Sequence, residues 1–111
     1  MAGRFELKRT SNDQFRFNLV AANGEIILTS ETYVHRQGAE NGIESVRDNA
    51  QHDHHFERKV AVDGAPYFVL KAGNGQIIGN SQMYSSNSAM EHGITSVKHN
   101  APAAPLHDLT V

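Results

Sequence analysis

The residues with the clearest potential for chemistry form a short histidine-rich run in the middle of the chain. His52, His54 and His55 surround Asp53, and imidazole and carboxylate groups are ligands for zinc and nickel. The pair His107–Asp108 is a further source of ligands if the fold brings it close. The spacing matches no established metal motif, and a loop does not hold its ligands in place. We therefore expect a solvated linker that binds metal only adventitiously, and we assign no metal site and no cofactor.

Two tyrosines, Tyr33 and Tyr84, each follow a serine by three residues, Ser30 and Ser81 respectively. Each tyrosine stands between a strand-like run and a helical pattern. One interpretation makes the two rings equivalent contacts for a ligand or partner. The other places each ring over the edge of the core with its hydroxyl in water, an arrangement common for aromatic side chains. We expect the second arrangement and keep the first as a hypothesis.

Basic side chains occupy the outward positions of the predicted strands. Lys8 and Arg16 in the first half, and Lys59, Lys71 and Tyr67 in the second, fall on the same predicted sheet face. Basic groups beside an aromatic ring can bind single-stranded nucleic acid through phosphate contacts and stacking. Acidic residues on the same face oppose this, and no aromatic motif typical of RNA-binding sheets is present. Tyr67 and Val69 are unusually apolar for this exposed face, so a protein partner is an equally well supported alternative.

No motif for catalysis is present. The chain has no cysteine, which excludes thiolate chemistry, and it contains no G-x-S-x-G sequence. Gly73-x-Gly75 lies at a turn and lacks the lysine and spacing of a phosphate-binding loop. The leading hypothesis is a non-enzymatic binding or interaction module that uses the exposed sheet face. An enzyme with a site between the repeats, built from Glu40, Glu91 or the histidines, remains the rival.

These candidate residues sit in a sequence that is written twice. A shift of 51 residues aligns residues 4–51 with residues 55–102 without a gap, and 19 of the 48 aligned positions are identical. Such a density of identities indicates an internal duplication. We expect one domain over residues 1–111, made of two repeats at about 3–53 and 54–111.

Each repeat shows the pattern of three strands followed by a helix. Apolar and polar residues alternate over 5–8 and 15–21, which is typical of half-buried strands. Asn23-Gly24, Asp63-Gly64 and Asn74-Gly75 are typical of tight hairpin turns. Short third strands follow at 26–29 and 77–80, and residues 106–111 resemble one more strand. Arg58 does not fit, because it takes an inward position, and a bulge or a place at the sheet edge would resolve this.

The helices are predicted from apolar residues that recur at helical spacing over 39–50 and 90–101. Gly42 and Gly93 lie within these apolar stripes, where we expect the helix backbone to press close to the sheet. Ser85 and Ser88 are candidate N-caps of the second helix. A single repeat is too small for a comfortable core. The two copies should therefore share one core, in an α+β fold with one antiparallel sheet, both helices on one face, and a pseudo-two-fold axis.

Composition limits the partners and the compartment. Hydrophobic residues make up 39% of the chain and charged residues 20%, as in folded globular proteins. The net charge of −2 argues against binding nucleic acid through bulk charge. No apolar run approaches the ~20 residues that span a bilayer, and the N-terminus lacks the apolar region of a signal peptide. We expect a cytoplasmic monomer that acts as a fused dimer, with an unknown protein or ligand as partner.

The sequence resembles the YegP-like family of small bacterial proteins, which carry a domain of unknown function. The resemblance rests on residues 74–78 (Asn-Gly-Gln-Ile-Ile), 81–86 (Ser-Gln-Met-Tyr-Ser-Ser), 93–98 (Gly-Ile-Thr-Ser-Val-Lys) and 100–102 (Asn-Ala-Pro). It implies β-β-β-α-β repeats joined into one sheet, with the last strand of each repeat exchanged. It implies no activity, cofactor or catalytic residue. The first copy departs from the pattern, with Val34-His35 in place of Ser85-Ser86.

Overall fold

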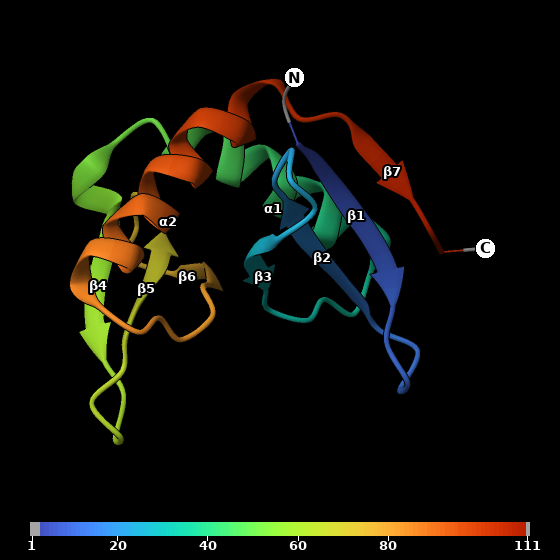
Figure 1. The fold of residues 1–111 in the computed structure, drawn as a ribbon. Coiled ribbons are helices and arrows are strands. Elements are labelled where there is room, and N and C mark those ends of the chain that lie inside the picture. The colour runs from blue at the N-terminus through green and yellow to red at the C-terminus, as the bar shows by residue number, and fades with distance from the viewer. Residues whose placement is uncertain (1–2, 111) are drawn as a thin grey trace.

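The computed structural model describes residues 3–110 as one seven-stranded sheet with two long helices (Figure 1). The first half contains β1 (Arg4–Arg9), β2 (Phe15–Val20), β3 (Ile26–Ser30) and α1 (Arg36–Asn49). The second half contains the short 3-10 helix η1 (Asp53–His55), β4 (Phe56–Val60), β5 (Pro66–Lys71), β6 (Ile77–Asn80), α2 (Asn87–Asn100), the 3-10 helix η2 (Ala101–Ala103) and β7 (Leu106–Asp108). The α+β fold with its duplicated β-β-β-α plan is confirmed.

The strands lie in the order β4-β5-β6-β3-β2-β1-β7. The two copies pair their strands in the same way: Phe5 faces Leu19 in the first copy, and Phe56 faces Leu70 in the second. The copies meet where β3 runs antiparallel to β6. The predicted pseudo-two-fold axis therefore passes through the centre of the sheet, between these two strands.

The C-terminal strand crosses to the other half, as expected, but it does not run antiparallel. β7 follows α2 of the second copy and pairs in parallel with β1 of the first. The Phe5 amide donates to the Pro105 carbonyl at 2.9 Å, and the Leu109 amide donates to the Leu7 carbonyl at 2.8 Å. The parallel direction follows because α2 returns the chain to the starting end of β1. Val111, the last residue of the predicted strand, lies outside the described residues.

The predicted hairpin turns are confirmed by the backbone. Gly24, Gly64 and Gly75 have φ between 87° and 89°, a conformation that L side chains avoid and glycine adopts freely. In the first hairpin of copy one, Asp13 takes the equivalent place with φ 67°. Asp tolerates this region better than most residues, so the turn forms there without glycine.

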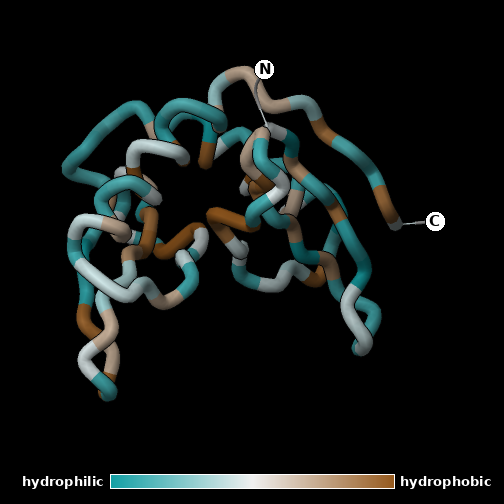
Figure 2. Tube along the Cα trace, in the orientation of Figure 1, coloured by the Kyte–Doolittle hydropathy of each residue, from teal (hydrophilic) through white to brown (hydrophobic). Residues whose placement is uncertain are grey.

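One core runs through both copies. Both helices pack on the same face of the sheet, where they cover Phe5, Leu7, Phe17, Leu19, Phe56, Phe68 and Leu70 with Ala39, Ile43, Val46, Met90, Ile94 and Val97. α1 contacts β5 and β6 of the other copy as well as its own β2, and α2 contacts β3 as well as β5. Figure 2 shows hydrophobic segments gathered near the middle of the molecule, around β3 and β6. The expectation of a shared core is met.

The second helix begins at a different serine from the two expected. Ser86 is the N-cap of α2, and its hydroxyl accepts a hydrogen bond from the Ala89 amide at 3.0 Å. Ser85 precedes the cap, and Ser88 lies inside the first turn, so both candidates were wrong. No helix within residues 3–110 is both long enough and apolar enough to cross a membrane.

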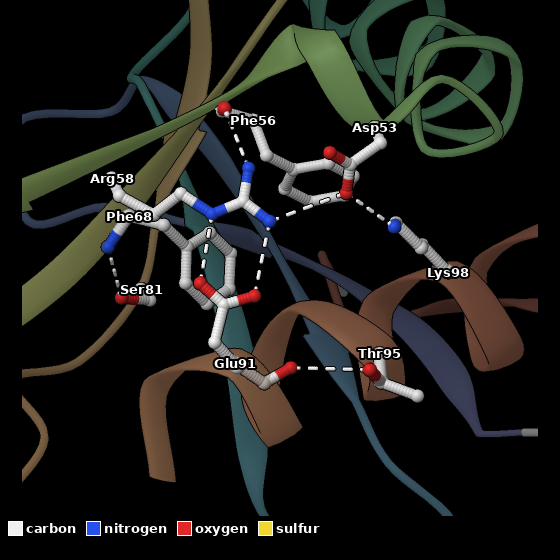
Figure 3. A network of polar contacts seen from close by, with 8 residues as sticks. All are labelled: Asp53, Phe56, Arg58, Phe68, Ser81, Glu91, Thr95 and Lys98. Carbon is white, nitrogen blue, oxygen red and sulfur yellow. Dashed lines mark hydrogen bonds and ion pairs between the residues drawn. The ribbon is translucent and has the colours of Figure 1, made fainter. Parts of the chain in front are cut away.

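The position of Arg58 is explained by the edge of the sheet. β4 has a neighbour only on one side, so the Arg58 side chain reaches out of the edge and meets α2 (Figure 3). Its guanidinium donates to both Glu91 carboxylate oxygens, at 2.9 and 3.0 Å, and to Asp53 at 3.2 Å. Lys98 also contacts Asp53, at 2.5 Å. The ion-pair network lies at the edge formed by β4. In the first copy the corresponding strand is β1, which is covered by β7, and Leu7 takes the position equivalent to Arg58.

Candidate functional site

Each of the two tyrosines is positioned by a serine hydroxyl that replaces part of the backbone ladder. Where β3 ends, the Ser30 hydroxyl accepts the Phe17 amide at 2.9 Å and donates to the Glu31 carbonyl at 2.7 Å. Ser81 makes the equivalent two bonds, at 3.0 and 2.7 Å, in the second copy. Both serines are buried. The repeated serines therefore fix the point where the chain leaves the sheet and turns toward the tyrosine.

The tyrosine rings pack between the sheet and a helical glycine. Tyr33 stacks on Phe17, with ring centres 6.2 Å apart and planes at 12°, and the second copy repeats this at 6.3 Å and 13°. A Cβ atom at Gly42 would lie 2.5 Å from the Tyr33 hydroxyl oxygen, and at Gly93 it would lie closer still to that of Tyr84. The expected close approach at both glycines is confirmed, with the tyrosine hydroxyl as the nearest neighbour. Both rings pack on the core edge, and their contact with a ligand stays a prediction.

A pocket opens beside each tyrosine, and both copies contribute to both pockets. The pocket at Tyr33, of about 790 Å³, is lined by α1 residues such as Asn41 and Ser45 and by residues 75–78 around the β5–β6 turn. The pocket at Tyr84, of about 370 Å³, has the equivalent lining of His92 and Ser96 from α2 and residues of the β2–β3 turn. The two pockets are therefore related by the pseudo-two-fold axis.

Burial and a nearby carboxylate act on each tyrosine. Burial raises the pKa of Tyr33 above its usual value, and the charge of Glu31 raises it further. For Tyr84, burial again raises the pKa, a hydrogen bond with Gln82 opposes the rise, and the charge of Glu25 adds to it. Both hydroxyls therefore stay protonated at neutral pH and can donate a hydrogen bond.

The predicted basic residues fall into two groups at opposite ends of the open sheet face. Lys8 lies opposite Arg16 on β1 and β2, and Lys59 lies opposite Tyr67 on β4 and β5. Lys71 forms an ion pair with Glu57. β3 and β6 separate the two groups, so the fold brings each group together but does not unite them.

Two acidic residues on this face neutralise part of its charge. Glu6 lies 2.8 Å from Arg4 and 3.5 Å from Lys8, and Glu57 pairs with Lys59 and Lys71. The hydrogen bond from Arg4 lowers the pKa of Glu6, and the hydrogen bond from Lys71 lowers that of Glu57. Both carboxylates are therefore charged at neutral pH, and their negative charge reduces the net positive charge of the open sheet face.

The open face also buries two valines that are not part of the main core. Val20 and Val69 are 2% and 4% exposed, yet they lie outside the core that the helices cover. They sit directly opposite Arg4 and Glu57 on the neighbouring strands, whose long side chains can lie over them. Sequence parity placed Val69 on an exposed face, and the structure shows that its neighbours bury it.

The histidine run does not form the hypothesised larger cluster. The rings of His52, His54 and His55 lie close together, with centres 4.4–5.9 Å apart. His107–Asp108, however, belongs to β7 at the opposite edge of the sheet from β4, so the proposed convergence was wrong. Within residues 3–110, no three or more His, Cys, Asp or Glu side chains are arranged to hold a metal ion.

Sequence reasoning missed the four side chains that give the pockets their polarity. Glu31 and Gln76 line the first pocket, and Glu25 and Gln82 line the second. Alignment of the repeats shows an exchange of Glu for Gln at both positions. This exchange places one glutamate in each pocket only because the turn of one copy faces the helix of the other. The repeat pattern contains no signal for that long-range arrangement.

Because Gly93 touches Tyr84, we predict that Gly93→Ala destabilises the protein by about 1–2 kcal/mol, since overpacking outweighs the helix propensity of alanine. In a Tyr84→Ala background the same change should be neutral or stabilising. Urea unfolding of the four proteins in this double-mutant cycle checks both signs. Equal effects in the two backgrounds would show that the tyrosine is not the reason for the glycine.

His55 should make stability depend on pH. Burial lowers its pKa, and the charges of His54 and His52 lower it further, so the unfolded chain binds the proton more readily. Stability from this residue is present above about pH 6.5 and is lost as the pH falls toward the folded pKa. We predict that His55→Gln flattens the pH dependence of the unfolding free energy between about pH 7.5 and 5, and that the exposed control His99→Gln does not. An unchanged slope in His55→Gln would contradict this assignment.

Comparison with known proteins identifies the family. Residues 10–57 and 61–108 match a domain of unknown function, DUF1508, and the two matches start 51 residues apart. A UPF0339 protein of Shewanella oneidensis is 53% identical over 99% of this chain and all of its own length. The UPF0339 protein YegP of Escherichia coli K12 is 52% identical over the same shares of the two chains.

Solved structures agree with the sequence matches. The solution NMR structure of E. coli YegP, described as a protein of unknown function, has a TM-score of 0.94 and covers 99% of this chain and 95% of its own. The NMR structure of the Shewanella oneidensis UPF0339 protein has a TM-score of 0.93, with 99% and 93% covered. The chain belongs to the UPF0339/YegP family, as a tandem of two DUF1508 domains.

Proposed function

We propose that this protein is a non-enzymatic interaction module that binds an acidic protein surface on its open sheet face. The observation that carries the proposal is the charge of this face. Five basic strand residues, Arg4, Lys8, Arg16, Lys59 and Lys71, share it with two acidic ones, Glu6 and Glu57, which leaves +3 (five minus two). The whole chain has a net charge of −2, so basic charge is concentrated where no helix packs.

The middle strands of the face favour a protein over a nucleic acid. Ile26 of β3 and Ile77 of β6 are 46% and 42% exposed, and these two strands lie between the two basic groups. Sequence-tolerant binding of single strands relies on stacking on several aromatic rings. Among the described strand residues of this face, Tyr67 is the single aromatic. Exposed isoleucines on the middle strands, with basic groups on either side, match a protein segment with apolar residues between acidic ones.

Two features support a binding role over catalysis. Glu91, a candidate for a site between the repeats, is held by Arg58, whose hydrogen bond lowers the pKa of its carboxyl. Glu40 is held by Arg36 at 3.1 Å. Both carboxylates therefore serve ion pairs: Glu91 ties α2 to β4, and Glu40 pairs within α1.

The test is titration of the 15N-labelled protein with a synthetic peptide that carries two leucines between runs of aspartate. We expect amide shifts on β2, β3, β5 and β6, and an affinity that falls as salt is added. Lys8→Gln with Lys71→Gln should weaken binding about three- to tenfold, because each exposed pair contributes up to about 1 kcal/mol.

The matched control is Gln37→Glu with Gln51→Glu, which changes the net charge by the same amount at exposed helix-side positions. Its affinity should stay within about twofold of the parent protein, because these sites lie far from the open face and are screened. A control that weakens binding as much as the lysine variant would contradict the proposal. Tighter binding of a single-stranded oligonucleotide of equal charge would replace the protein partner with nucleic acid.

A further inference from the structure

Each of the two tyrosine pockets contains a single glutamate, although it comes from a different position of the repeat in each pocket. The pocket at Tyr33 contains one carboxylate, Glu31, and two carboxamides, Gln76 and Asn41. The pocket at Tyr84 contains Gln82 and Glu25 at the equivalent places, so acid and amide have changed sides. Among the described residues, no lysine or arginine lines either pocket. Each pocket therefore holds one glutamate, and the place of that glutamate in one pocket is taken by glutamine in the other.

Glu25 and Glu31 differ from the other glutamates of the chain. Five of the seven glutamates form ion pairs with lysine or arginine, namely Glu6, Glu40, Glu44, Glu57 and Glu91. Within residues 3–110, no cation lies within ion-pair distance of Glu25 or Glu31. The two glutamates without an ion pair among the described residues are therefore the two that line the tyrosine pockets.

Both carboxylates act on the tyrosine of their own pocket. Besides burial, Glu31 raises the pKa of Tyr33, and Glu25 raises that of Tyr84. Glu31 comes from the same copy as its tyrosine, whereas Glu25 comes from the other copy. One glutamate thus lines each pocket together with the tyrosine and the helix serine, Ser45 or Ser96.

From this arrangement we propose that each tyrosine pocket binds the ammonium group of a small polar amine, with Glu31 or Glu25 as counter-ion. The tyrosine and serine hydroxyls and the carboxamide serve the polar remainder of the molecule. The charge-assisted contact is the strongest available in such an open pocket. Two pockets give two sites per chain. Apart from Ile77, their lining lies off the open sheet face, so this inference is independent of the proposed protein partner.

The test uses the full-length 15N-labelled protein and ethanolamine at pH 7, with sodium acetate and sodium chloride at equal ionic strength as controls. The amides of Gly42 and Gly93 report on the first and second pockets. We expect both to shift and to saturate with ethanolamine, and to move little with either salt. Absence of saturation, or equal shifts with sodium chloride, would overturn the proposal.

Three variants separate binding from general effects. Glu31→Gln should weaken the Gly42 response about tenfold, as loss of a charge-assisted bond implies, and should leave Gly93 unchanged; Glu25→Gln should do the reverse. Glu31→Gln with Gln76→Glu moves the carboxylate to the place it has in the other pocket and should restore the Gly42 response. A Gly42 response unaffected by Glu31→Gln, or one that the paired change does not restore in a folded protein, contradicts the assignment.

Discussion

The structure depends on the burial of apolar surface across the seam between its two copies. β3 and β6 pair through only Thr29 with Asn80 and Ser30 with Gly79, and so short a ladder cannot hold the halves together by itself. The helices do so, because α1 reaches β5 and β6, and α2 reaches β3. Apolar burial is the dominant favourable contribution to folding, and here each copy supplies the cover that the other lacks.

The seam has a shape requirement as well as a hydrophobic one. Leu28 of the first copy is buried at the seam, and its counterpart in the second copy is Gly79. A Cβ atom at Gly79 would lie 2.8 Å from the Thr29 carbonyl oxygen. The copies have therefore diverged where they touch: the Leu28 side chain fills space at the seam, and the glycine at position 79 leaves room for it. Because the two positions differ in size, the two-fold symmetry is not exact at the axis.

The tyrosine pockets are a consequence of this fusion. Each is closed on one side by the helix of one copy and on the other by a turn of its partner copy, so neither would exist in a separated repeat. The repeated serine, tyrosine and glycine are accounted for by backbone hydrogen bonds and packing. The packing does not use Glu25 and Glu31, the two glutamates without an ion pair among the described residues. The polar side chains available for binding are therefore among the residues that differ between the copies.

Much of the fold could be predicted from the sequence, because its signals are local. The turns at Gly24 and Gly75, the helical stripes and the order of elements all depend on residues close together in the chain. The direction of β7, the facing of turn and helix across the seam, and the distance of His107 from His52 depend on long-range packing. Arg58 illustrates this limit: the strand alternation predicts its inward position, but its partner Glu91 is 33 residues away in the chain.

The most direct test of the shared core is the behaviour of residues 1–52 expressed alone. Sedimentation and thermal unfolding monitored by circular dichroism would show its state. The fragment contains β1, β2, β3 and α1, yet it lacks the strands and the helix that complete the interior. It should have no cooperative thermal transition as a monomer, while the full chain melts in a single one. A monomeric fragment that unfolds cooperatively would contradict the dependence of each copy on the other.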